Sequence, residues 1–284
     1  MKILMCAGHA NLAPGGNPVE RSLTRAITPR VALHCIARGA DASVVTPNPD
    51  GTVTISLEGR ANKVLAINQQ TQVDIFLEIH AEHNSAGDAG RGCFVVFPDS
   101  PEQNDTDVHV RDTLGPQIAR AIRDMTSIPL RGNGTLSEKK TAVGLGGGRL
   151  AVFRITRPIR ATCRRLIVEV GAFSSPADLA ILQQPQTPDR IGRAIAQALV
   201  PEAKTPAAWG TAVPFNRDFG IPLMWCEEQV RQRGLGRAKS PEFTHAGKTW
   251  QLFDDGAISW TEATGAEVHR PAPPDVEQAA PEVE

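Results

Sequence analysis

The stretch Val73-Asp-Ile-Phe-Leu-Glu-Ile-His80-Ala-Glu82 is the part of the sequence around which the rest is organised. Its middle, from Ile75 to Ile79, is almost entirely apolar, which predicts a central strand covered on both faces. The strand ends abruptly in a polar run that begins at His80. Because ligands of open α/β sheets bind at the carboxyl ends of strands, His80 is well placed for chemistry.

Two other predicted strands bring reactive side chains to such positions. The first runs from Lys2 to Cys6 and leads directly to His9, and Glu20 follows at the start of a helical stretch. The other, from Arg165 to Phe173, contains Glu169 within an apolar run. A carboxylate buried there without a partner costs several kcal/mol. Glu169 therefore needs a metal, a cation or a raised pKa, and each of these favours a functional site.

Two imidazoles and one carboxylate form a suitable set of zinc ligands, and we predict that His9, Glu20 and His80 hold Zn²⁺. Three protein ligands leave one position open for water, as in catalytic zinc sites. Glu169 is then available as the general base.

These residues resemble the pattern of the zinc-dependent N-acetylmuramoyl-L-alanine amidases, the amidase 3 family. The matching segments are Ala7-Gly8-His9, Glu20, Leu57-Glu-Gly-Arg60, Asn68, Glu78-Ile79-His80-Ala81 and Val168-Glu169-Val170-Gly171-Ala172-Phe173-Ser174-Ser175. They occur in the family order over roughly the first two thirds of the chain. Glu78 stands where the family usually has Ser, and Ser175 where Asn is common.

The resemblance implies hydrolysis of the amide between N-acetylmuramic acid and L-alanine in peptidoglycan, with zinc as cofactor. Two alternatives stay open. One is a zinc peptidase or deacylase that acts on another amide, and the other is a catalytically silent peptidoglycan-binding protein.

Composition limits the function classes. The chain has 284 residues, of which 41% are hydrophobic and 21% charged, and this is typical of one ordinary globular domain with a smaller one. A net charge of −1 argues against nucleic-acid binding driven by charge. No stretch reaches the roughly 20 apolar residues of a membrane span. Five cysteines without a Cys-x-x-Cys pair argue against a disulfide framework. We expect a monomer.

The apolar run at the amino terminus is too short for a signal peptide and is needed as a strand. We therefore expect synthesis in the cytoplasm and action on the cell wall after release or export. This favours an endolysin of phage or prophage type.

Strands alternating with helices predict an α/β fold, in which helices cover both faces of a mostly parallel or mixed sheet. We expect Pro29 to kink or break the first helix. The expected strands are residues 2–6, 42–46, 73–80, 92–97, 149–155 and 165–173, and the expected helices are 20–38, 57–72, 110–125, one that begins at 175, and 189–199.

The predicted domain organisation has four parts: a zinc amidase domain over 1–200, a linker over 201–208, a small Trp-containing β-rich domain over 209–269 and a disordered Pro/Glu-rich tail over 270–284. The third part contains all four tryptophans. It is faintly similar to the LGFP repeats of some cell-wall-associated proteins, which would give it a targeting role. A Trp cluster that stacks on sugars and a simple small core are both open for it.

Four secondary features complete the prediction. On a regular strand Glu78 and Glu82 share a face with His80, so either can accept from an imidazole N–H; for Glu82 we favour a solvated carboxylate. We interpret His83 as a rim or substrate contact and His34 as an ordinary, partly buried residue. The glycine-rich run Gly144–Gly148 precedes a predicted strand, so it fits a flexible loop at the cleft edge better than a phosphate loop.

Overall fold

The computed structural model describes residues 1–8, 17–45, 57–99, 104–201, 235, 239–240, 243–261 and 265–280. The chain divides into two compact units, Met1–Lys204 and Thr205–Glu284, and each is described here by itself. No helix among the described residues has both the length and the apolar character needed to cross a membrane.

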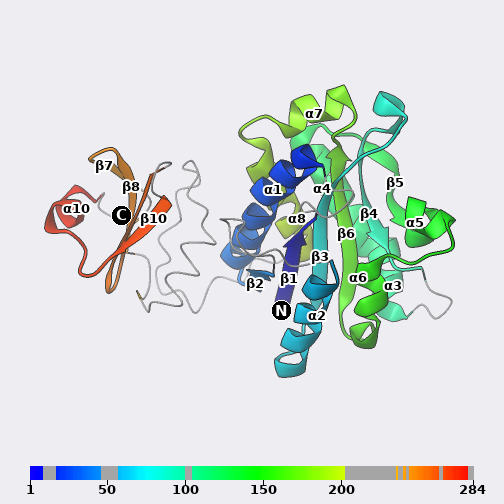
Figure 1. Ribbon diagram of the computed structural model, residues 1–284, viewed down its shortest axis with the longest axis horizontal. Coiled ribbons are helices and arrows are strands. Elements are labelled where there is room, and N and C mark those ends of the chain that lie inside the picture. Colours follow the sequence, from blue (N-terminus) through cyan, green and yellow to red (C-terminus); the bar gives the residue numbers. More distant parts are fainter. Residues whose placement is uncertain are drawn as a thin grey trace. The chain divides into compact units, whose positions relative to one another are not determined.

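The larger unit is built on a six-stranded sheet with the order β2-β1-β3-β6-β4-β5 (Figure 1). Strands β1, β2, β3 and β6 are parallel to one another, whereas β6 pairs with β4 in antiparallel fashion and β4 with β5 in parallel. Their bounds are β1 Lys2–Ala7, β2 Asp41–Val44, β3 Ile75–Glu82, β4 Cys93–Phe97, β5 Leu130–Ser137 and β6 Arg164–Ala172. The predicted mixed α/β sheet is thereby confirmed.

Helices cover both faces of this sheet. The helical elements are α1 Pro18–Ala37, α2 Leu57–Gln70, η1 Gly87–Gly90, α3 Asp105–His109, η2 Val110–Leu114, α4 Gly115–Thr126, η3 Glu138–Lys140, α5 Ala142–Leu145, α6 Ala151–Ile155, η4 Arg157–Ile159, α7 Pro176–Leu182 and α8 Thr187–Leu199. One apolar core lies between the sheet and α1, α4 and α8 and includes Ile27, Ile118 and Ile195. The other lies beneath α2 and α6 and includes Val64 and Phe153.

Three local predictions differ from the structure. The apolar run 149–155 was expected to be a strand but forms α6, because its buried Val152 and Phe153 cover the sheet face instead of joining the ladder. Short apolar runs do not distinguish a buried strand from a buried helix. The chain continues in helical form through Pro29, so no break occurs there. The helical region expected at 110–125 begins earlier, with α3 at Asp105.

Sequence reasoning did not find strand β5. Its sequence Leu-Arg-Gly-Asn-Gly-Thr-Leu-Ser has the glycines of a turn, and Gly132 and Gly134 both have positive φ. The pairing with β4 passes from Cys93–Leu130 to Val95–Thr135, so residues 131–134 leave the regular ladder.

The smaller unit contains an antiparallel sheet with the order β10-β9-β8-β7. Its strands are β7 Phe243–His245, β8 Lys248–Phe253, β9 Gly256–Thr261 and β10 Gly265–His269. Strands β8 and β9 form a hairpin around Asp254 and Asp255. Trp250 is buried in a small core and donates from Nε1 to the His245 carbonyl at 3.1 Å, so it is a core residue and not an exposed platform. Trp209 and Trp225 lie outside the described residues.

The tail predicted to be disordered is ordered in part. Helix α10, Pro274–Ala279, begins with proline at its first position, where a missing N–H costs nothing. Val276 in this helix is only 1% exposed and packs into the small core of the unit. Ala272 of the same segment also belongs to this core, so a few apolar side chains anchor a segment whose composition is otherwise that of a disordered chain.

The contact between α1 and α8 gives a test of the packing in the larger unit. A Cβ atom added at Gly192 would lie 2.7 Å from Arg30 Cβ and 2.8 Å from the Arg30 backbone carbon. Gly192→Ala should therefore lower the free energy of unfolding by about 1–3 kcal/mol, because the two helices must separate. Urea unfolding measures this, and Gln197→Ala on the exposed face of α8 is the control. Equal stabilities of Gly192→Ala and wild type would contradict the close packing.

Candidate active site

The carboxyl ends of three neighbouring parallel strands meet at one edge of the sheet. Ala7 of β1 is paired with Ile79 of β3, and His80 of β3 is the register partner of Glu169 of β6. Directly paired residues point to the same face, so the His80 and Glu169 side chains lie side by side. The sequence-based placement of these two residues at a common edge agrees with this register.

Glu20 reaches the same place from the first turn of α1. Asn17 caps this helix by accepting from the Val19 amide at 2.8 Å, and Pro18 occupies the first turn. Glu20 is 6% exposed, and its Oε1 lies 3.1 Å from His80 Nδ1 and accepts from the Ala81 amide at 3.3 Å. A carboxylate in the first turn is also favoured by the positive end of the helix dipole.

Gly8 gives the His80 ring the space that it occupies. A Cβ atom at position 8 would lie 2.5 Å from three carbons of the imidazole. The Gly8 amide donates to the Ile79 carbonyl at 2.6 Å, and Thr24 Oγ1 donates to the Gly8 carbonyl at 2.8 Å. The backbone that leads to His9 is therefore fixed between β3 and α1 and packed directly on the ring.

Glu78 occupies the other side of the imidazole. Its Oε2 lies 3.4 Å from His80 Nε2, and its Oε1 lies 3.6 Å from Arg60 Nε. Arg60 is 2% exposed and donates to the Ala7 carbonyl at 2.6 Å. Both ring nitrogens of His80 thus face carboxylates, and a buried cation offsets the charge of Glu78.

The pKa values of the site reflect this crowding. Burial lowers the pKa of His80, but hydrogen bonds to Glu20 and Glu78 and the nearby charge of Glu169 outweigh that effect and raise it to about 10. Burial raises the pKa of Glu169 to about 7, and the negative charges of Glu20 and Glu82 act in the same direction. The positive charges of His80 and Arg131 oppose the rise. Among the described residues, the shielded Oε2 of Glu169 has no hydrogen-bond partner.

Arg131 is a residue of this region that sequence reasoning missed. It stands at the start of β5, where its guanidinium forms an ion pair with Glu82 and lies 5.1 Å from the centre of the Phe94 ring. Glu82 also accepts from Asn84 Nδ2 at 3.4 Å, so the interpretation of Glu82 as a solvated carboxylate was wrong. The sequence held no signal for this pair because it depends on the reversed direction of β4 and β5.

The remaining sequence-based candidates lie as follows. His9 is outside the described residues. His34 is 6% exposed and pairs with Asp189 at 2.7 Å on the α1–α8 contact, and His83 packs against Phe173. The Gly144–Gly148 run leads into α6 and not into a strand. In the part of the chain that the structure describes, no group of three or more His, Cys, Asp or Glu side chains is arranged to hold a metal ion.

An imidazole and several carboxylates lie at the carboxyl edge of an open sheet, and burial raises the pKa of one of these carboxylates toward neutrality. Such groups are suited to acid–base chemistry. The sequence profile of the N-acetylmuramoyl-L-alanine amidase family (Amidase_3) matches residues 3–200. The chain belongs to this family of hydrolases.

Solved structures with the same fold come from several bacteria. The amidase Ami1 of Mycobacterium smegmatis is 21% identical with a TM-score of 0.52, over 72% of this chain and 96% of that one. The catalytic domain of the amidase CwlV of Bacillus (Paenibacillus) polymyxa var. colistinus is 17% identical with a TM-score of 0.52, over 72% of this chain and 100% of that one. At this level of identity the likeness establishes the fold. No curated protein sequence matches the chain significantly.

Gly8 allows a direct test of the site. Gly8→Ala places a methyl group against the His80 ring and should displace it. Displacement of an active-site group by about 1 Å typically lowers the rate about 10²-fold. We therefore expect the rate of peptidoglycan hydrolysis to fall by this order, while an unchanged circular dichroism spectrum shows that the variant is folded. Gln197→Ala, on the exposed face of α8, changes a side chain away from the His80 ring and is the control. Full activity of Gly8→Ala would contradict the tight contact with His80.

Proposed function

We propose that the chain is a zinc-dependent N-acetylmuramoyl-L-alanine amidase that cleaves the amide between N-acetylmuramic acid and L-alanine in peptidoglycan. In this proposal His9, Glu20 and His80 hold Zn²⁺, and Glu169 is the catalytic residue. The observation that carries it is the pairing of Glu169, with its raised pKa, and His80 at one buried edge. Membership of the amidase family supports the substrate.

The described residues supply two of the three proposed zinc ligands, Glu20 and His80. Imidazole nitrogen and carboxylate oxygen are zinc ligands, and two ligands of one tetrahedral ion with bonds of about 2.0–2.1 Å lie about 3.3 Å apart. His80 Nδ1 and Glu20 Oε1 are 3.1 Å apart, which is compatible with a shared ion. Among the described residues Oε2 of Glu169 has no hydrogen-bond partner, which supports a role that a further group completes. Since a ligating imidazole must be neutral, metal binding should release the proton of His80.

Glu78 and Arg60 have a positioning role in this proposal. If His80 Nδ1 faces the metal, Nε2 carries the remaining proton and donates it toward Glu78. Arg60 holds Glu78 from behind through its Nε at 3.6 Å. The Glu at position 78, where the family usually has Ser, thus supplies a carboxylate that fixes the imidazole tautomer.

The reaction itself is a proton relay by Glu169. When bound, zinc supplies Lewis-acid polarisation of the amide carbonyl and acidifies a water molecule. The Glu169 carboxylate takes the proton of the attacking water and then delivers it to the nitrogen of the leaving L-alanine amine. Burial raises the pKa of Glu169 toward neutrality, which is the direction that lets the group both accept and release a proton near neutral pH.

Two variants separate the proposed roles. Glu169→Gln should keep zinc and lower kcat by about 10²–10⁴-fold, since the base is lost but no ligand is removed. His80→Ala should lose zinc. Elemental analysis of the purified proteins and digestion of peptidoglycan measure the two effects. Retained lysis by Glu169→Gln would rule out its role as base, and unchanged zinc content of His80→Ala would rule out its role as ligand.

The position of Arg131 near Glu169 predicts how its replacement shifts the pH dependence of kcat/KM. The base must be ionised, so kcat/KM should rise with pH through the pKa of Glu169 in the free enzyme. Arg131→Gln removes a cation that lowers this pKa and frees the anionic Glu82, which raises it, so the acidic limb should move to higher pH. Arg131→Lys keeps the charge and is the control. Bound zinc should lower the pKa of Glu169 in wild type and in both variants alike, so the expected shift of the acidic limb between them remains. Coinciding limbs for Arg131→Gln and wild type would contradict the electrostatic coupling.

A zinc peptidase or deacylase acting on another amide would share this chemistry, and a panel of muropeptides and peptides separates the two functions. The wall-targeting role of residues 209–269, the endolysin origin and the monomeric state stay predictions.

A further inference from the structure

One segment of the larger unit carries several positive charges and no acidic residue. Between residues 139 and 168 the sequence has no Asp or Glu, although the chain as a whole has a net charge of −1. The cations of this segment are Lys139, Lys140, Arg149, Arg154, Arg157, Arg160, Arg164 and Arg165. Such segregation creates a local positive potential that the net charge conceals.

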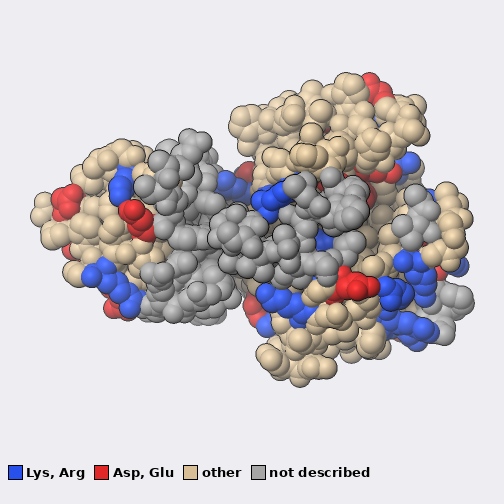
Figure 2. All heavy atoms as spheres, in the orientation of Figure 1, with Lys and Arg blue, Asp and Glu red and all other residues tan. Residues whose placement is uncertain are grey.

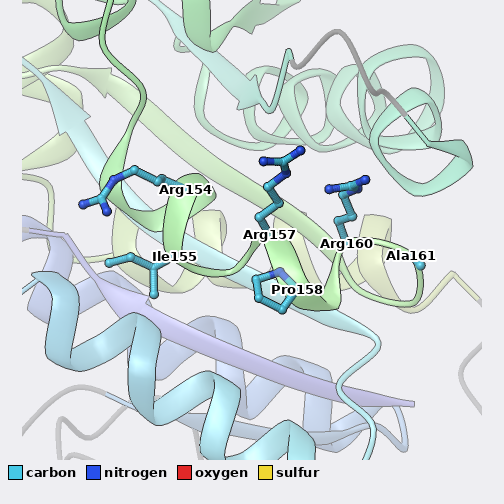
Figure 3. A pocket seen from close by; sticks show the side chains of 6 residues that line it. All are labelled: Arg154, Ile155, Arg157, Pro158, Arg160 and Ala161. Atoms are coloured by element: carbon cyan, nitrogen blue, oxygen red, sulfur yellow. The ribbon is translucent and has the colours of Figure 1, made fainter.

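Three of these arginines surround one hollow of about 570 Å³ on the surface (Figure 3). It is lined by Arg154, Ile155, Arg157, Pro158, Arg160 and Ala161. Figure 2 shows Lys and Arg side chains gathered over the part of the surface where α6 and α3 lie in Figure 1. The hollow therefore has a cationic rim and a small apolar wall.

The local backbone sets the directions in which two of these arginine side chains leave the chain. Arg157 begins the 3₁₀ turn η4, and the Arg160 amide donates to the Arg157 carbonyl at 3.1 Å. Residues three apart in a 3₁₀ turn are eclipsed, so both side chains leave the turn on one side, as Figure 3 shows. Asn104 and Thr106, at the start of α3, donate from their side chains to the Arg160 carbonyl. The spacing of these arginines is thus set by the fold.

Acidic side chains from other elements offset part of this charge, and Arg157 and Arg160 also have interactions of their own. Arg165 pairs with the buried Asp107 beneath the surface, and Arg149 pairs with the buried Glu138. At the hollow itself, Arg154 lies 3.4 Å from Glu58, and both of these side chains are more than half exposed. An exposed pair contributes little and yields easily to a competing anion.

The hollow lies away from the catalytic edge. It precedes the start of β6 at Arg164, and Glu169 lies five residues further along that strand, roughly 17 Å at about 3.3 Å per residue. Occupation of the hollow therefore does not require the residues of the proposed zinc site.

We propose that this hollow binds the phosphate groups of an anionic polymer that carries no nucleobases. Guanidinium groups bind phosphate through paired hydrogen bonds, and two eclipsed arginines can hold one phosphate or two successive ones. Proteins that bind single-stranded nucleic acid stack bases on aromatic side chains, and none of the described residues that line the hollow is aromatic. The site extends the proposed function by giving the enzyme a second, electrostatic contact with a polymer.

The test is the binding of the whole chain to inorganic polyphosphate. Titration calorimetry at several salt concentrations measures its affinity. Arg157→Gln/Arg160→Gln should weaken binding at least tenfold. It should also reduce the slope of log K against log salt by about 1–2, as expected for the loss of one or two phosphate contacts. Arg123→Gln/Arg193→Gln removes two exposed arginines from helices α4 and α8, on the opposite face, and should change affinity less than twofold.

Measurements of folding, of hydrolysis and of binding to other polymers make the outcome decisive. Urea midpoints equal to wild type show that the variants fold, and hydrolysis of a small, phosphate-free muropeptide should be unchanged in both double variants. Binding does not depend on turnover, so failure of this proposal and of the amidase proposal are distinguishable. Absence of polyphosphate binding by wild type, equal losses in the two double variants, equal affinity for polyglutamate, or tighter binding of a single-stranded oligonucleotide would each overturn the inference.

Discussion

The crowding of negative charge around one buried imidazole is the constraint on which the larger unit depends. Glu20, Glu78 and Glu169 approach His80 from a helix, from its own strand and from the neighbouring strand. Removing a carboxylate from water costs several kcal/mol unless a cation or hydrogen bonds compensate for it. Each carboxylate of this group therefore requires a specific neighbour, and these neighbours explain much of the surrounding architecture.

Two of the three carboxylates, Glu78 and Glu20, have supporting neighbours. Arg60 in α2 lies behind Glu78 and ties it to the end of β1. The first turn of α1 and the Ala81 amide support Glu20. Glu169 has no such hydrogen-bonding partner for its Oε2 among the described residues, and its raised pKa is the physical consequence. In the proposed function this difference divides the roles. Glu20, which has supporting neighbours, binds the metal, and Glu169, which lacks them, transfers protons.

The sequence was sufficient to predict most strands of the sheet and the edge at which His80 and Glu169 lie. The reason is that the buried strands around Ile75–Ile79 and Leu166–Val168 are strongly apolar and have polar ends. It failed where several structures share one local pattern. The run at 150–155 is apolar enough for a strand, yet the fold uses it to cover the sheet as α6. Strand β5 has the glycines of a turn, and only its pairing with β4 reveals it. Arg131 and its pair with Glu82 follow from that pairing, so no local pattern could have indicated them.

The central claim is that this edge hydrolyses the amide next to N-acetylmuramic acid with the help of zinc. Its most direct test is digestion of purified peptidoglycan with and without a chelator, with the products identified by mass spectrometry. The account predicts free stem peptides that begin with L-alanine, their disappearance with chelator and their return when zinc is added. Cleavage at other bonds with every muramoyl–alanine amide intact, or unchanged release of stem peptides in the presence of chelator, would contradict it.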